Sequence, residues 1–235
     1  MLKIFVVALL VSVMGLIFVP NLALAASAAG NTNTQTSQGQ TATQKLIVKA
    51  RTSWPWYVTR ASGLVASGAL IILLISGIGQ VTGYAFKFLE PLTAWASHRA
   101  LGLVFGVAVL LHVFKLLFDH FITFNIYQIL FPFVSDYKRA TILGVHVGSI
   151  YVAMGIVAFY AVIMIILTSL LWVEKKPRLW KLIHFLAYLV MFDVFLHALF
   201  IGTDFAHGIF RWLWIIGGVS VAVAVIHRLR RARTI

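Results

Sequence analysis

Hydrophobic residues occur in long runs along this chain, and polar residues collect between the runs. An α-helix of about 20 residues, rising about 1.5 Å per residue, crosses the hydrocarbon core of a bilayer, which is about 30 Å thick. Five runs reach this length. We predict transmembrane helices at about residues 57–81, 93–117, 141–172, 179–201 and 210–226. The pattern therefore predicts an all-α polytopic transmembrane helical bundle.

The first 25 residues are typical of a signal peptide. Lys3 precedes an apolar stretch, and Ala23 and Ala25 supply a small-residue cleavage site. The apolar stretch is slightly long, so an uncleaved signal anchor, which would add a sixth span, is the alternative. Residues 26–53 are expected to form a disordered and interfacial extracytoplasmic linker, because an uncharged, aperiodic segment is followed by mixed basic and aromatic residues. Residues 54–235 then form the membrane domain.

Composition supports the membrane assignment and excludes several classes of site. Hydrophobic residues make up 61% of the 235 residues, and the mean hydropathy is +0.98, far above that of soluble domains. The chain has no cysteine, which excludes disulfides, iron–sulfur clusters, thiolate zinc sites and c-type heme attachment. The net charge of +13 comes mostly from helix ends and tails, where it suits lipid headgroups. No nucleic-acid partner is expected, because no basic face or known binding motif is present.

The distribution of basic residues predicts how the chain is oriented. Lysines and arginines cluster at residues 173–181 and in the last eight residues, and this bias marks the cytoplasmic side of a membrane protein. A signal segment at the start of the chain leads to the same orientation. We therefore expect a multi-pass protein of the plasma (inner) membrane, with the mature N-terminus outside and the C-terminus in the cytoplasm.

Four histidines lie within two of the predicted spans. Fourteen positions separate His98 from His112 in the second span, and thirteen separate His184 from His197 in the fourth. Both separations correspond to about 20 Å along a helix. These two spans should run in parallel, so His98 and His184 share the inner level while His112 and His197 share the outer level. Ionisable residues inside a membrane usually mark a functional site, and histidine without cysteine suits heme iron.

The spacing of thirteen in the fourth span raises a geometric difficulty. At 100° per residue, fourteen positions return a side chain to within about 40° of its starting direction, whereas thirteen leave it about 140° away. His184 and His197 therefore do not share a face on an ideal straight helix. Helix tilt, side-chain reach or a local distortion has to bring both toward the second span.

The pattern HRALG followed by LLH, then LGVHVGSIYVAMGIVAFYAVIMIILTS, a basic turn and WKLIHFLAY followed by a second histidine, resembles the ferric reductase-like transmembrane domain. That family includes ferric reductases, NADPH oxidases and the heme subunit of bacterial methionine sulfoxide reductase systems. The resemblance covers about residues 57–228. It implies two b-type hemes, one ligated by His98 and His184 and the other by His112 and His197, with electrons moving from the cytoplasmic side outwards.

The chain also departs from the family pattern. Full-length reductases and oxidases continue into a flavin- and NADPH-binding region, but this sequence has no Gly-rich dinucleotide fingerprint. We expect an oxidoreductase component whose electron donor is a separate flavoprotein or a quinol. Its acceptor would be ferric iron, oxygen or an extracytoplasmic reductase. The chain length and the third and fourth spans look most like the sulfoxide reductase heme subunit, whereas His98 looks like the diheme reductases.

Three charged residues near the histidine levels are further candidates. Arg60 and Arg99 lie near the outer and inner levels, where a guanidinium can bind heme propionates in a bidentate manner. The alternative for both arginines is snorkelling to the headgroups. Asp193, one turn before His197, is a candidate to hold an imidazole N–H or to take up protons.

Aromatic residues and the remaining histidines have weaker assignments. Tyr188, Phe192 and Phe195 either shorten an electron path between the two levels or simply pack. His146, near the outer level of the third span, either packs or contacts the outer heme or an acceptor. Three further histidines are expected at the membrane interface: His120, His207 and His227. An acceptor site near His120 or His207 is the alternative.

Other functions fit the same spans. The four histidines would then form helix–helix hydrogen bonds, and the protein would be a membrane anchor for a partner complex or a small transporter with a proton path. A monoheme membrane subunit serving a separate reductase is a further alternative.

Overall fold

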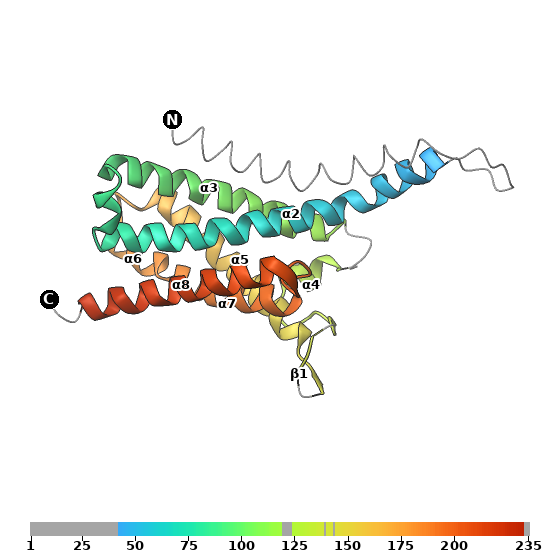
Figure 1. Ribbon diagram of the computed structural model, residues 1–235. Coiled ribbons are helices and arrows are strands. Elements are labelled where there is room, and N and C mark those ends of the chain that lie inside the picture. The colour runs from blue at the N-terminus through green and yellow to red at the C-terminus, as the bar shows by residue number, and fades with distance from the viewer. Residues whose placement is uncertain (1–41, 119–123, 139, 143, 233–235) are drawn as a thin grey trace, which may run out of the picture.

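The computed structural model describes residues 42–118, 124–138, 140–142 and 144–232 (Figure 1). The predicted signal segment, the linker up to residue 41, and His120 lie outside these residues. Within them, five helices are long and apolar enough to cross a membrane, at Trp56–Val81, Pro91–Leu116, Gly148–Leu171, Pro177–Ile201 and Gly208–Arg230. The predicted all-α polytopic bundle is confirmed.

The elements follow one another in a simple order. Helix α2 (Ala42–Val81), the short 3₁₀ helix η1 (Tyr84–Lys87) and helix α3 (Pro91–Leu116) form the first half, and α4 (Ile126–Leu130) follows. Strands β1 (Thr141–Ile142) and β2 (Val145–His146) precede α5 (Gly148–Leu171), α6 (Pro177–His184), α7 (Leu186–Ile201) and α8 (Gly208–Ala232). Helix α2 extends back to Ala42, so residues 42–53 of the predicted linker are helical.

The third span begins later than predicted, because the residues before it form a hairpin. Thr141 pairs with His146 and Ile142 with Val145 in an antiparallel register. Gly144 has a φ of 81°, a backbone conformation that glycine adopts without steric cost, and it therefore allows the tight turn. β-Branched residues on both sides favour the extended backbone. His146 consequently lies on an exposed hairpin, and the prediction that it belongs to the third membrane span is wrong.

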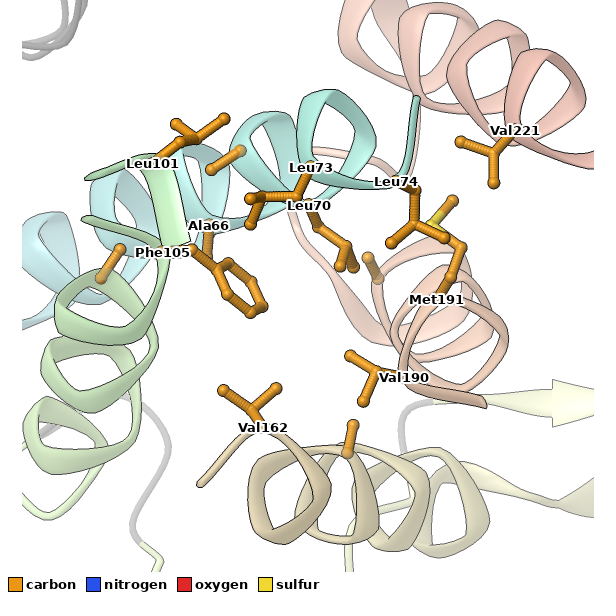
Figure 2. Packing of buried hydrophobic residues seen from close by; sticks show 14 of the residues in the cluster. Ala66, Leu70, Leu73, Leu74, Leu101, Phe105, Val162, Val190, Met191 and Val221 are labelled. Carbon is orange, nitrogen blue, oxygen red and sulfur yellow. The ribbon is translucent and has the colours of Figure 1, made fainter. Parts of the chain in front are cut away.

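The core lies where α2, α3, α5, α7 and α8 meet. Leu70 and Leu74 of α2, Phe105 of α3, Val162 of α5 and Val190 of α7 point toward one another there (Figure 2). Helix α2 packs mainly against α3, and α5 packs mainly against α7. Alanines shared among these helices allow close approach, which is how helices associate in lipid; the buried ones include Ala66, Ala69, Ala158 and Ala161.

Trp214 packs helix α8 against α7 and the connection that follows it. The Trp214 ring is only 2% exposed, stacks on Phe195 with ring centroids 5.6 Å apart, and lies 5.1 Å from the ring of Phe205. Its Nε1–H donates to the Phe195 carbonyl at 3.1 Å. A buried aromatic ring with a satisfied polar atom fixes both the position and the rotation of the helix.

We predict that Trp214→Ala lowers the free energy of unfolding by about 3 kcal/mol, because a large cavity is left between α7 and α8. Thermal and denaturant unfolding in detergent micelles measures this loss. Trp212→Ala is the matched control, since Trp212 is on the same helix but 62% exposed, and it should change stability little. Equal losses in the two variants would contradict the anchoring role of Trp214.

Candidate functional site

The four histidines of the second and fourth spans form two facing pairs. The ring centroids of His98 and His184 are 6.3 Å apart, and those of His112 and His197 are 6.5 Å apart. Each pair takes one histidine from α3 and one from the fourth span, so these two spans run in parallel. The structure therefore brings together the histidines that were predicted to pair, while the assignment of the pairs to an inner and an outer level stays a prediction.

The fourth span is interrupted between its two histidines. Helix α6 ends at His184, and α7 begins at Leu186. Around the break, Tyr188 N bonds to the Phe185 carbonyl at 3.1 Å, the tighter i to i+3 pattern of a 3₁₀ turn. Helix α3 runs unbroken past His98 and His112. The distortion therefore occurs in the span where a spacing of thirteen required one.

Backbone carbonyls orient the histidines of the second pair. His112 Nδ1 lies 2.9 Å from the Thr59 carbonyl oxygen, and His197 Nδ1 lies 2.8 Å from the Tyr151 carbonyl oxygen. A carbonyl only accepts hydrogen bonds, so Nδ1 carries the proton in both rings. In a neutral imidazole this leaves a lone pair on Nε2, the form that ligates a metal.

Serine hydroxyls contact the histidines of the first pair. His98 Nδ1 is 3.0 Å from Ser76 Oγ. The Ser76 hydroxyl also donates to the Leu73 carbonyl at 3.1 Å, which leaves its oxygen to accept from the imidazole. His184 Nδ1 is 3.5 Å from Ser169 Oγ, and Trp180 Nε1 donates to the same oxygen at 3.0 Å.

The ring separations are wide enough to leave room for a metal ion between the two rings of each pair. A metal held in line between two imidazole nitrogens, each about 2 Å away, separates the ring centroids by roughly 6 Å. A direct N–H···N hydrogen bond has about 3 Å between its nitrogens, which would bring the rings about 1 Å closer. Both pairs have the wider separation. The described residues contain no group of three or more metal-ligating side chains.

Glycines give three of the histidines their space. An added Cβ at Gly63 would lie 3.1 Å from His112 Nδ1, and one at Gly77 would lie 3.2 Å from His98 Cε1. At Gly155 the same atom would lie 2.6 Å from His197 Nδ1, which is closer than real Cβ contacts. The imidazoles therefore lie directly against the backbone of a neighbouring helix, which is α2 for His98 and His112 and α5 for His197.

A cavity of about 230 Å³ lies at the second pair. His112 and His197 line it together with mostly apolar side chains of α2, α3, α5 and α7, including Phe105 and Val162. Polar side chains also line it, among them Arg60, Gln128, Tyr137 and Asp204. An apolar cavity with a few polar groups suits a largely hydrophobic ligand that carries charged substituents.

The predicted arginines have different surroundings. Arg60 Nε donates to Asp204 Oδ2 at 2.8 Å, and Nη2 donates to the other carboxylate oxygen, so the pair is bidentate. The Arg60 guanidinium also lies over the Trp56 ring, 4.2 Å from its centroid. Arg99 is exposed, and its guanidinium lies 5.4 Å from the Trp95 centroid, as expected for snorkelling. The binding of propionates by Arg60 or Arg99 stays a prediction.

Asp193 does not hold His197 Nδ1, and Phe192 does not lie in the core. Proton uptake by Asp193 stays a prediction. Asp193 is buried in α7, but the Nδ1 partner of His197 is the Tyr151 carbonyl. Phe192 is 57% exposed and faces away from the core. Phe105 takes the more central position, because it lies seven positions from both His98 and His112 and is buried.

Tyr188 and Phe195 pack toward α8. Tyr188 Oη accepts a hydrogen bond from Arg228, and Phe195 stacks on Trp214. The interfacial position expected for the last two histidines stays a prediction. His207 is exposed in the connection between α7 and α8, and the His227 ring lies 5.8 Å from that of Tyr84.

Several residues of the site were not predicted. Asp204 has no local signal, because its partner Arg60 is 144 positions away in the chain. The sequence did contain a local signal for Ser76 and Ser169, since a polar side chain inside an apolar span needs a hydrogen-bonding partner. Phe105 also carried one, because a spacing of seven returns to nearly the same helix face.

Comparisons of the chain with protein-family models, curated proteins and solved structures gave no match. The function therefore has to be inferred from the two histidine pairs and their surroundings.

If the two histidine pairs bind heme, we predict that Gly155→Ala removes about half of the heme bound per chain, because the added methyl group displaces the His197 ring. Heme content and visible spectra of the purified protein measure this. Gly68→Ala is the matched control, because an added Cβ at Gly68 meets nothing within 4 Å. Unchanged heme content in Gly155→Ala would show that the His197 ring position is not needed for binding.

Proposed function

We propose that this protein is a diheme b-type transmembrane electron-transfer protein of the ferric reductase-like kind. One observation carries the proposal: two histidine pairs, with ring centroids 6.3 and 6.5 Å apart, occur at two levels between the same two parallel spans. In this arrangement His98 and His184 would ligate one heme b, and His112 and His197 the other.

The described side chains supply what such a cofactor requires. Four imidazoles would hold the two hemes, and the contacts of their Nδ1 atoms fix the ring orientations. Mostly apolar side chains line the cavity at the second pair, and glycines allow the backbone to come close. When bound, each heme supplies a one-electron iron couple whose potential depends on ligands, burial and nearby charge.

The basic residues support an orientation for electron flow. The start of α6 and the end of α8 lie at the same end of the bundle, whereas α4 and the β hairpin lie at the other (Figure 1). The first end carries several cations, among them Lys175, Lys176, Arg178, Lys181 and Arg228. By the basic-residue rule this end faces the cytoplasm. The protein would then lie in the plasma (inner) membrane, with its mature N-terminus outside.

Electrons would enter at the His98–His184 pair and leave from the His112–His197 pair. The donor would be a separate flavoprotein or a quinol on the cytoplasmic side. The acceptor would be ferric iron, oxygen or an extracytoplasmic reductase. Phe105 of α3 is buried in the core, seven positions from both His98 and His112, so it is the described aromatic side chain best placed between the pairs.

The deciding experiment is a reduced-minus-oxidised visible spectrum of the purified protein, with heme quantified per chain. We expect two b-type hemes in the wild type, and one in either His184→Ala or His197→Ala. His146→Ala is the matched control, because His146 is exposed on the hairpin and belongs to neither pair, and it should keep two.

Each other outcome has a definite meaning. One heme in the wild type would support the monoheme alternative, and the histidine variant that abolishes it would identify the pair that binds. A wild-type protein without heme, after expression with ample heme supply, would overturn the proposal and leave the anchor or transporter.

A further inference from the structure

The ion pair between Arg60 and Asp204 connects two distant parts of the chain beside the second histidine pair. Arg60 is on α2, and Asp204 lies in the connection between α7 and α8. Both line the cavity that His112 and His197 also line. The side chain of Asp204 is only 12% exposed and that of Arg60 34%, so the pair lies largely out of solvent, where charges interact more strongly than in water.

The neighbours of the pair link it to the histidines. The carbonyl of Thr59, the residue before Arg60, accepts from His112 Nδ1. Asp204 lies two turns after His197, just beyond the end of α7. The ion pair therefore joins the helix that orients one histidine to the segment that follows the other.

Only some of the N–H donors of the Arg60 guanidinium contact Asp204. An arginine has five N–H groups, and the bidentate contact with Asp204 uses two of them, on the edge formed by Nε and Nη2. The Trp56 ring covers one face of the guanidinium. Asp204 thus fixes the plane of the Arg60 guanidinium at the wall of the cavity. The other N–H donors of the guanidinium are not used by Asp204.

We propose that Asp204 is a positioning residue that holds Arg60 against the cavity and lowers the redox potential of the heme between His112 and His197. This inference rests on the proposed function. The ferric form of a heme carries one more positive charge than the ferrous form. A carboxylate nearby therefore favours the ferric form, whereas a guanidinium favours the ferrous form. The two charges therefore shift the redox potential in opposite directions, and their combined effect on it is close to zero.

Substitutions that remove one charge at a time test the proposed effect on the redox potential. Spectroelectrochemical titration of the full-length protein measures the midpoint potential of each heme. Asp204→Asn should raise the midpoint potential of one heme, and Arg60→Gln should lower it. A shift of roughly tenfold in the equilibrium between ferrous and ferric heme corresponds to about 59 mV for one electron. Repeating both measurements in His184→Ala, which keeps only the second pair, assigns the heme that shifts.

The control removes the same charge elsewhere. Asp136 is an exposed carboxylate next to Tyr137, another residue of the cavity wall, and Asp136→Asn should shift neither midpoint. A purely structural ion pair predicts a different result, because breaking it from either side loosens the same contact. Asp204→Asn and Arg60→Gln would then shift the midpoint in the same direction.

Shifts in the same direction, or no shift in either variant, would overturn the inference while two hemes remain bound. If Asp204→Asn does not fold, Arg60→Gln and the double variant R60Q/D204N carry the test. The midpoint of the double variant should lie above that of Arg60→Gln and near that of the wild type, and a lower value would overturn the role of Asp204. A wild-type protein without heme would instead overturn the proposed function.

Discussion

The structure depends on how an imidazole is accommodated between apolar helices. Each ring has two nitrogens, and a buried polar atom without a partner is costly. All four histidines place Nδ1 on an acceptor of a neighbouring element: two backbone carbonyls and two serine hydroxyls. These contacts fix the orientation of the rings, and each ring lies 6.3 or 6.5 Å, between centroids, from its counterpart on the other span.

The packing of the helices follows from this constraint. A helix carbonyl can accept from an imidazole only where the ring reaches the backbone, and Gly63 and Gly155 provide that access for His112 and His197. The break at Phe185 has the same origin, since His184 and His197 cannot both face α3 from one regular helix. A glycine or a break that would weaken an ordinary span is here a condition for placing two rings at the required separation.

The sequence predicted the spans and the pairing of the histidines because both depend on periodicity and length, which are local properties. Thirteen positions between His184 and His197 even indicated that the fourth span had to be distorted, though not where. The hairpin before α5 was missed, because its apolar residues continue the hydrophobic run and only Gly144 marks the turn. The Arg60–Asp204 pair was missed for another reason: it depends on how α2 packs beside the end of α7, and no local pattern records that.

The hydrogen bonds of the second pair also bear on the choice between electron transfer and a proton path. A proton relay needs groups that accept a proton on one side and release one on the other, as hydroxyls and free imidazoles do. The Nδ1 protons of His112 and His197 instead end at the carbonyls of Thr59 and Tyr151, which accept a hydrogen bond but have no proton to pass on. Rings held in this way keep their Nδ1 protons on these carbonyls and are well suited to present Nε2 to a metal. The same contacts that make these histidines poor carriers of protons therefore support their proposed role as fixed axial ligands.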